Sequence, residues 1–266
     1  MARDALFAFA GTLSFEEDEA LEKLTYWGEG GDGRSTSAAS RAEAYASIEA
    51  VFGKYLPQQY KTWDDLDTDA GIAELCIVGV GSWYLKASRS AAAAGHDVPP
   101  ESAFECNIEY MSRYDVRSTW CRYGASAYLG TVPADGSLPP LLGVWSCSHS
   151  KLFTPSDALW GHAKALFKAT LGASLTLRDH LLHTHWILSN GLDRAARTTL
   201  SPTHPLRRLL KPHYYGAAKI NSASMDLLMP VGGFAHRTFA LTAESWTSYF
   251  ADMAREWTYV PFPVPN

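Results

Sequence analysis

The chain has 266 residues, of which 47% are hydrophobic and 12% aromatic, which is enough to bury one large core or two smaller ones. Its formal net charge of -5 and isoelectric point near 6.0 exclude nucleic acid as a partner, because no basic stripe emerges to neutralise phosphates. No run approaches the about 20 apolar residues of a membrane span, so an integral span is not expected. The N-terminal segment makes a poor signal peptide, and the four cysteines form no C-x-x-C pair. Free thiols and a cytoplasmic location are therefore expected.

The first part of the chain, residues 1–104, is predicted to be helical and irregular. Glycine and serine favour a loop at 28–40, and helical spacing favours a helix at 41–52. Helix and strand signals are mixed over 70–87, and a second loop is expected at 89–101. The next part, residues 105–150, predicts a small β region. Aromatic and β-branched residues lie between turn clusters there in three segments, 106–111, 125–130 and 140–146.

The last part, residues 151–266, predicts a helical core. One helix is expected to end at Gly172, and a second should cover 175–192. Prolines break the following region into short pieces, and later helices are expected at 215–229 and 243–257. The prediction is a single, mainly α domain over residues 1–266 with a small β-sheet in the middle of the chain.

Four motifs follow one another in the second half of the chain. They are Trp160-Gly-His-Ala163-Lys164, His180-x4-His185, Thr199-Leu-Ser-x-x-His204-Pro-Leu-x-x-Leu-Leu-x-Pro-His213, and Ile220-Asn221-Ser-Ala223. Their order and gaps match the lipoxygenase family, which the chain resembles. The resemblance implies a lipoxygenase-like helical core. The chain stops at Asn266, before the family's later iron ligands (a histidine, an asparagine and a chain-end carboxylate). The expectation is therefore a truncated lipoxygenase-like protein lacking the C-terminal part of the catalytic domain.

The histidine segment is the candidate catalytic centre. The resemblance places His180 and His185 at the family's first two iron ligands. Five steps on a regular α-helix leave side chains about 140° apart, so their convergence would need a π-type turn. His180 and His183 are three apart and converge without distortion, so both pairings stay open. By the resemblance, Asn221 is a structural residue, expected to hydrogen-bond a broken stretch of neighbouring backbone.

Three classes of function remain open. The favoured one is a metal-independent enzyme that binds an apolar polyene (a polyketide, terpenoid or lipid) and catalyses a cyclisation, isomerisation or pericyclic, Diels–Alder-type step by shape and hydrogen bonding. The first alternative is a lipoxygenase-type dioxygenase of polyunsaturated fatty acids with non-haem iron or manganese on His180 and His185. It needs further ligands, because such sites take at least two histidines and a carboxylate. The second is a non-catalytic lipid-binding or interaction protein.

Candidate residues follow from these alternatives. The catalytic candidates are His180, His183, His185 and Arg197, whose side chains could polarise a carbonyl. Apolar residues at helical spacing could line a substrate pocket, although such residues are more often core: Phe167, Leu171, Leu182, Trp186 and Met225. No cofactor is expected for the favoured class. A homodimer is expected as a way to bury apolar faces.

Overall fold

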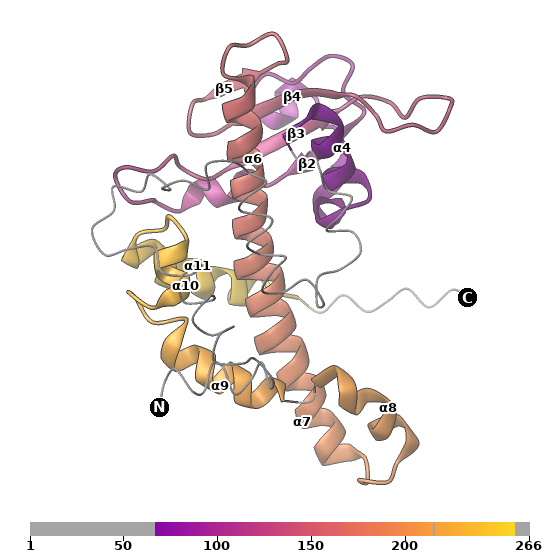
Figure 1. Ribbon diagram of the computed structural model, residues 1–266, viewed down its shortest axis with the longest axis vertical. Coiled ribbons are helices and arrows are strands. Elements are labelled where there is room, and N and C mark those ends of the chain that lie inside the picture. Colours follow the sequence, from indigo (N-terminus) through magenta and orange to yellow (C-terminus); the bar gives the residue numbers. More distant parts are fainter. Residues whose placement is uncertain (1–66, 215, 259–266) are drawn as a thin grey trace, which may run out of the picture. The chain divides into compact units, whose positions relative to one another are not determined.

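The computed structural model describes residues 67–214 and 216–258. This part is mostly helical and contains one five-stranded antiparallel sheet, as predicted (Figure 1). The loop predicted at 28–40 and the helix predicted at 41–52 lie outside the described residues, and the single domain over 1–266 stays a prediction. No helix in the described part is long and apolar enough to cross a membrane.

The elements of the described ranges alternate at first and then become helical. The first half contains α4 (Asp69–Ile77), η2 (Val80–Tyr84), β1 (Leu85–Ala87), α5 (Ala91–Ala94), β2 (Phe104–Asn107), η3 (Glu109–Arg113), β3 (Ala125–Leu129), β4 (Leu141–Ser146) and β5 (Lys151–Phe153). The second half contains α6 (Trp160–Ser174), the π-helix η4 (Leu175–Ser189), α7 (Asn190–Thr199), α8 (Pro205–Tyr214), α9 (Ala217–Leu227), α10 (Phe234–Thr238) and α11 (Ala243–Glu256).

The sheet is a meander in which each strand pairs with the next in sequence order. It is wider than the predicted β region 105–150, because it begins at Leu85 and ends at Phe153. Both added strands have three residues. Strands this short carry too little alternation to be read from sequence, and their pairing with β2 and β4 makes them strands.

The strand predicted at 106–111 is wrong in its second half. β2 ends at Asn107, and a short 3-10 helix follows at Glu109–Arg113. The backbone N–H of Glu109 donates to Asn107 Oδ1 at 3.0 Å, and Ser112 Oγ donates to the carbonyl of Glu109 at 2.7 Å. These local bonds offer the backbone an alternative to the strand ladder.

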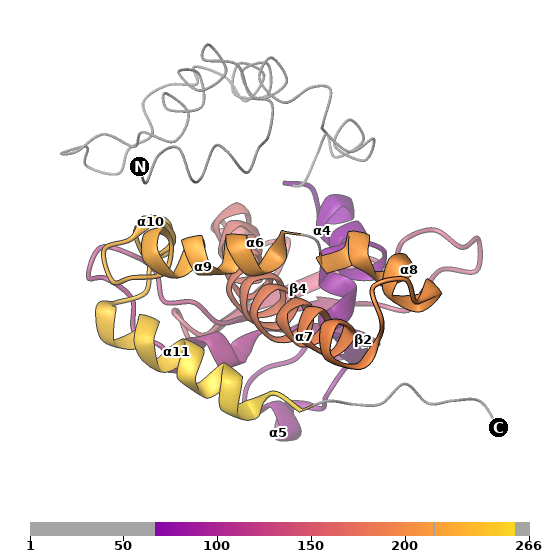
Figure 2. The same cartoon turned by 90° about the horizontal axis from the view of Figure 1, so that it is seen from below.

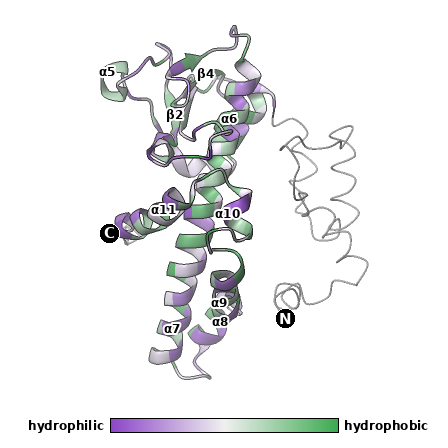
Figure 3. Ribbon diagram, turned by 90° about the vertical axis from the view of Figure 1, so that its left-hand side faces the viewer, coloured by the Kyte–Doolittle hydropathy of each residue, from purple (hydrophilic) through white to green (hydrophobic). Residues whose placement is uncertain are grey.

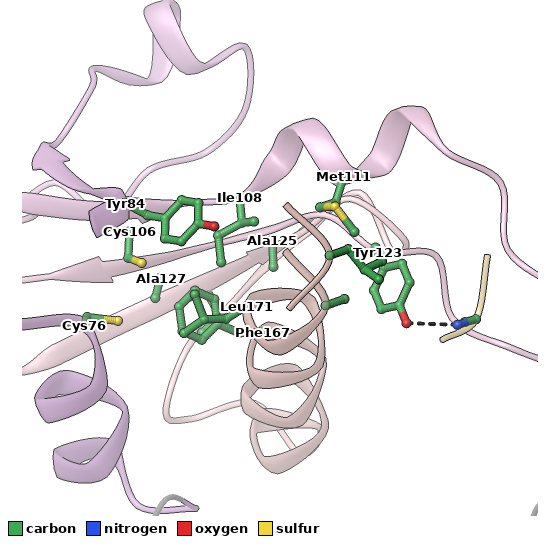
Figure 4. Packing of buried hydrophobic residues seen from close by; sticks show 14 of the residues in the cluster. Cys76, Tyr84, Cys106, Ile108, Met111, Tyr123, Ala125, Ala127, Phe167 and Leu171 are labelled. Atoms are coloured by element: carbon green, nitrogen blue, oxygen red, sulfur yellow. Dashed lines mark hydrogen bonds between the residues drawn. The ribbon is translucent and has the colours of Figure 1, made fainter. Parts of the chain in front are cut away.

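One face of the sheet forms the core with α6, which packs on β3 and β4. Figure 4 shows Phe167 and Leu171 of α6 lying against Ala127 and Ala125 of β3, and all four are buried. Tyr123 ties this core to the C-terminal helices, because its hydroxyl accepts the N–H of Ala240 at 3.1 Å. The small side chains of β3 let the helix approach closely, and this contact anchors the start of the long helix.

A single continuous helix runs from Trp160 to Thr199 through α6, η4 and α7 (Figure 1). The predicted end at Gly172 is wrong. A glycine ends a helix when it adopts a left-handed conformation, but the positive-φ glycines of the described residues do not include Gly172. Its neighbours Leu171 and Ala173 are buried, so packing carries the helix through the glycine.

The helices that follow the long helix, α8 to α11, lie beside its lower half (Figure 1). α9 and α11 each contact η4 and lie on different sides of it when the molecule is seen from below (Figure 2). α8 contacts α7, and hydrophobic and hydrophilic residues are mixed along both helices (Figure 3). The helices predicted at 215–229 and 243–257 correspond to α9 and α11. The π-helix is thus held on two sides, which fixes the orientation of the side chains it carries.

Candidate functional site

The π-helix places His180 and His185 at one point. A π-helix closes its hydrogen bonds over five residues and is wider than an α-helix, so side chains five apart lie on the same side of it, which a regular α-helix does not achieve. The Nε2 atoms of the two rings are 3.1 Å apart, and the ring centroids are 4.8 Å apart. His180 is exposed and His185 is half-buried. The sequence predicts that His180 and His185 converge only if a π-type turn forms, and in the structure they do converge.

Asn221 of α9 fixes which nitrogen of His185 carries the proton. Its Nδ2 donates to the carbonyl of His185 at 2.7 Å and to Asn190 Oδ1 at 2.8 Å. This leaves Asn221 Oδ1 to accept from His185 Nδ1 at 3.0 Å. A neutral His185 with a proton on Nδ1 presents a lone pair on Nε2, toward His180.

The same bonds confirm that Asn221 has the expected structural role, because this buried side chain hydrogen-bonds the π-helical backbone at His185. The hydroxyl of Ser189 donates to the same carbonyl of His185. Sequence reasoning missed Ser189 and Asn190. The signal available was polar residues four and five positions after a candidate ligand, inside a helix.

His183 does not join the pair. Its Nδ1 lies 3.6 Å from Asp179 Oδ1, and its side chain is 25% exposed. Burial lowers the pKa of His183, an effect that Asp179 opposes. Burial also lowers the pKa of His180, and His185 lowers it further. Both influences favour a neutral imidazole at His180, which is the form that can bind a metal ion.

The histidine pair fits two neighbouring corners of a metal site. With metal–nitrogen bonds of about 2.1 Å at right angles, two ligand nitrogens lie about 3.0 Å apart, and the observed separation is 3.1 Å. The acceptor on His185 Nδ1 is the usual outer partner of a ligating imidazole. Within 67–214 and 216–258, no group of three or more His, Cys, Asp or Glu side chains could hold a metal ion. The described residues therefore supply two positions of a site and not a complete one.

Other titratable residues of the described part, and the catalytic candidate Arg197, have partners away from the histidine pair. Glu109 bonds Arg89 and Ser126 on the sheet, His204 Nδ1 accepts the N–H of Leu206 at the start of α8, and His236 Nδ1 accepts the N–H of Gly232. Arg197 lies on α7, twelve positions beyond His185, where it bonds Asp193 at 2.7 Å and its side chain is 64% exposed. It lines a separate basic pocket with Arg207 and Arg208.

The candidate substrate-binding residues occupy different environments. Phe167, Leu171 and Leu182 are buried in the hydrophobic core, whereas Met225 is 54% exposed on α9. Trp186 is half-buried and packs against Phe250 with ring centroids 5.4 Å apart. Their assignment to a substrate pocket stays a prediction.

The fold and this geometry define a class of protein: it is mainly helical, and a π-helical segment of its long central helix brings two imidazoles together. Residues 127–262, about half of the chain, match the family model described as Lipoxygenase. The chain belongs to the lipoxygenase family, which confirms the resemblance found in its motifs.

Relatives agree with this assignment. The chain is 30% identical over 145 residues to linoleate 9S-lipoxygenase 6 of Solanum tuberosum and to linoleate 9S-lipoxygenase 5 of Arabidopsis thaliana. These matches cover 49% of this chain and 17% and 16% of the relatives, so the chain spans about a sixth of the length of the curated relatives it matches.

Solved structures show the same fold. Coral 8R-lipoxygenase superposes with a TM-score of 0.57 at 18% identity, covering 71% of this chain and 32% of that one. The manganese lipoxygenase of Gaeumannomyces graminis superposes with a TM-score of 0.56 at 18% identity, covering 72% and 37%. These likenesses confirm the predicted lipoxygenase-like helical core.

Proposed function

We propose that the chain is a lipoxygenase-type enzyme in which His180 and His185 supply two ligands of a non-haem iron or manganese centre acting on an unsaturated fatty acid. The observation that carries the proposal is the 3.1 Å separation of the two Nε2 atoms, with the His185 tautomer set by Asn221. The linoleate lipoxygenases among its relatives support the substrate class. A bound iron or manganese ion would supply the one-electron chemistry that removes hydrogen from a 1,4-diene.

The chain's own residues do the positioning. The π-helix brings both imidazoles to one side, burial lowers the pKa of His180 and so favours its neutral form, and Asn221 keeps the proton of His185 on Nδ1. A redox-active non-haem centre takes at least one carboxylate beyond two histidines. The proposal therefore assigns two ligands to the π-helix and leaves the others to groups outside the described set.

The metal-independent cyclisation favoured from sequence is the second candidate. This candidate is retained because the described residues bring two histidines together without a third His, Cys, Asp or Glu ligand. It would work by shaping an apolar polyene and by hydrogen bonding from an imidazole. A non-catalytic lipid-binding protein, a homodimer and a cytoplasmic location also stay predictions.

Metal analysis separates these candidates. The purified protein is titrated with Fe(II) and with Mn(II) under anaerobic conditions, and bound metal is counted per chain. We expect about one metal ion per chain in the wild type and its loss in His180→Ala and in His185→Ala. The control is His162→Ala, an exposed histidine on α6 of the same continuous helix. It should bind metal like the wild type.

Activity is then measured as dioxygen uptake with linoleate. Uptake that requires the metal and both histidines supports the proposal. A folded protein that binds neither metal, or that binds it equally well in all three variants, would overturn it. In that case conversion of an apolar polyene without dioxygen uptake would point to the cyclisation, and reversible fatty-acid binding without turnover would point to a lipid-binding protein.

A further inference from the structure

A second cavity lies where the sheet meets the start of the π-helix. Its volume is about 500 Å³, within the usual range for small-molecule sites. Its lining includes the aromatic residues Trp83, Tyr84 and Tyr110, the cations Lys86, Arg89 and Arg178, and the carboxylate of Glu105. None of the proposed catalytic steps uses this combination of aromatic surface and charge.

Arg178 is held in a fixed position in the wall of this cavity. Its guanidinium carbon lies 4.9 Å from the ring centroids of both Tyr84 and Tyr110. Its Nε donates to Asp179 Oδ1 at 2.9 Å, and its side chain is 19% exposed. Neither Nη atom forms a hydrogen bond to another described residue. The guanidinium therefore sits between two rings with its outer donors available to a ligand in the cavity.

The two rings are themselves held in place. The hydroxyl of Tyr84 bonds Asp179 and lies 2.7 Å from Ser174 Oγ, and the hydroxyl of Tyr110 lies 2.5 Å from the same Ser174 Oγ. Tyr249 of α11 adds a contact at 3.3 Å to the hydroxyl of Tyr110. We call Tyr84, Tyr110 and Tyr249 the tyrosine cluster. An arginine fixed before binding loses little freedom when a ligand arrives, which favours affinity.

The charges around the cavity argue against a dianionic ligand. Arg89 is engaged by Glu105 at 2.6 Å and by Glu109 at 2.9 Å. Lys86 is exposed and forms no ion pair with the residues described here. Counting the bonded carboxylates, the positive and negative charges are close to balance, so a dianionic phosphate gains little. A planar carboxylate matches the two outer donors of a guanidinium.

The rim adds an apolar contact. Trp83 lines the cavity and is 79% exposed, so its indole face is available to the body of a ligand. From these features we propose that the cavity is a binding site for a small amphipathic carboxylate: the carboxylate is held by Arg178 and Lys86, and the apolar body packs on Trp83.

This site is separate from the histidine pair. Arg178 precedes His180 by two residues, and helix side chains two apart do not face each other. A ligand on Arg178 therefore points away from His180 and His185. The proposal does not depend on the metal centre, and either can fail without the other.

The test uses phenylpropionate as the probe and phenylpropanol as its uncharged counterpart, both titrated by calorimetry into the full chain. We expect saturable binding of phenylpropionate and at least about tenfold weaker binding of the alcohol, because a charge-assisted bond is lost. Arg178→Gln should weaken binding by about tenfold or more, and Lys86→Ala by a few-fold. Lys219→Ala, an exposed lysine on α9, is the matched control and should bind like the wild type.

Further variants test the proposal even if Arg178→Gln does not fold. If Arg178→Gln does not fold, the weaker binding expected of Lys86→Ala and Trp83→Ala carries the test, since both side chains are exposed. His180→Ala should bind the probe unchanged. The proposal is overturned by equal binding of the alcohol, by displacement with an equal concentration of inorganic phosphate, by loss of binding in His180→Ala, or by no saturable binding at millimolar probe.

Discussion

Replacing Asn221 by alanine tests how the α9 helix supports the histidine pair. Asn221 is 5% exposed, and its side chain forms three hydrogen bonds, two to His185 and one to Asn190. Asn190 is exposed, so water replaces its lost donor. The carbonyl of His185 keeps the hydroxyl of Ser189 as a donor, but the Nδ1–H of His185 loses its acceptor in a half-buried position.

The magnitude follows from these bonds. The His185 carbonyl loses one of its two donors, at a cost of about 0.5–1.5 kcal/mol, and the unpaired Nδ1–H costs about 1–3 kcal/mol, which together give about 2–4 kcal/mol. For a chain of this size that corresponds to a fall of roughly 4–16 °C in the midpoint of thermal unfolding. If the proposed metal site is correct, Asn221→Ala also weakens metal binding by about 10- to 100-fold, because the outer partner of a ligating imidazole is lost.

The assay is thermal unfolding followed by circular dichroism, together with metal titration of the same samples. Ser222→Ala, an exposed neighbour on the same helix, is the control and should unfold like the wild type. Asn221→Asp separates the two effects. Its carboxylate still accepts the Nδ1–H of His185 but cannot donate to the His185 carbonyl, so stability falls while metal affinity stays within a few-fold. An Asn221→Ala protein that unfolds at the wild-type midpoint would refute the reasoning.

Two further predictions concern the described core. Burial raises the pKa of each residue in the tyrosine cluster above the value near 10 of an unfolded tyrosine. This contribution to stability is complete below about pH 10 and is lost as the pH rises further. The three tyrosines should therefore ionise only as the protein unfolds, which is measured by comparing tyrosinate absorbance with circular dichroism. Ionisation of every tyrosine in the folded protein would contradict this. Gly124→Ala should cost about 2–5 kcal/mol, since Gly124 has φ +107° and an added Cβ would lie 2.6 Å from Ser112 Cβ. Gly136→Ala, at φ +75° with nothing within 4 Å, should cost only about 1–2 kcal/mol by denaturant unfolding, and equal losses would refute the steric argument.

The local sequence pattern is sufficient to predict helices and strands whose apolar residues recur at regular spacing. β3 and β4 were found within a residue or two because aromatic and β-branched residues lie there between turns. α9 and α11 were found because apolar residues recur at helical spacing. The three-residue strands β1 and β5 and the short helix α10 carry no such period. They exist because neighbouring elements bond and cover them.

The helix break predicted at Gly172 shows the opposite failure. A glycine is a statistical stop signal, but the stop needs a left-handed conformation that local sequence cannot impose. Burial of the neighbouring Leu171 and Ala173 in the hydrophobic core keeps the helix going instead. The result is one continuous helix, and its length carries the π-helical segment far enough from the sheet to meet α9 and α11.

For the candidate site, the sequence by itself determined the family and the two histidines, because the spacing of His180, His185 and Asn221 is a property of the chain. It also determined that a π-type turn was the condition for the pair to converge. Only the tertiary structure decided that the turn forms, that His183 faces Asp179 instead, and that Asn221 selects the tautomer of His185. The physical reason is that a π-helix loses regular hydrogen-bond geometry and persists where side chains from another helix bond its backbone, here the amide of Asn221. That partner lies 36 residues away, so no local pattern could show it.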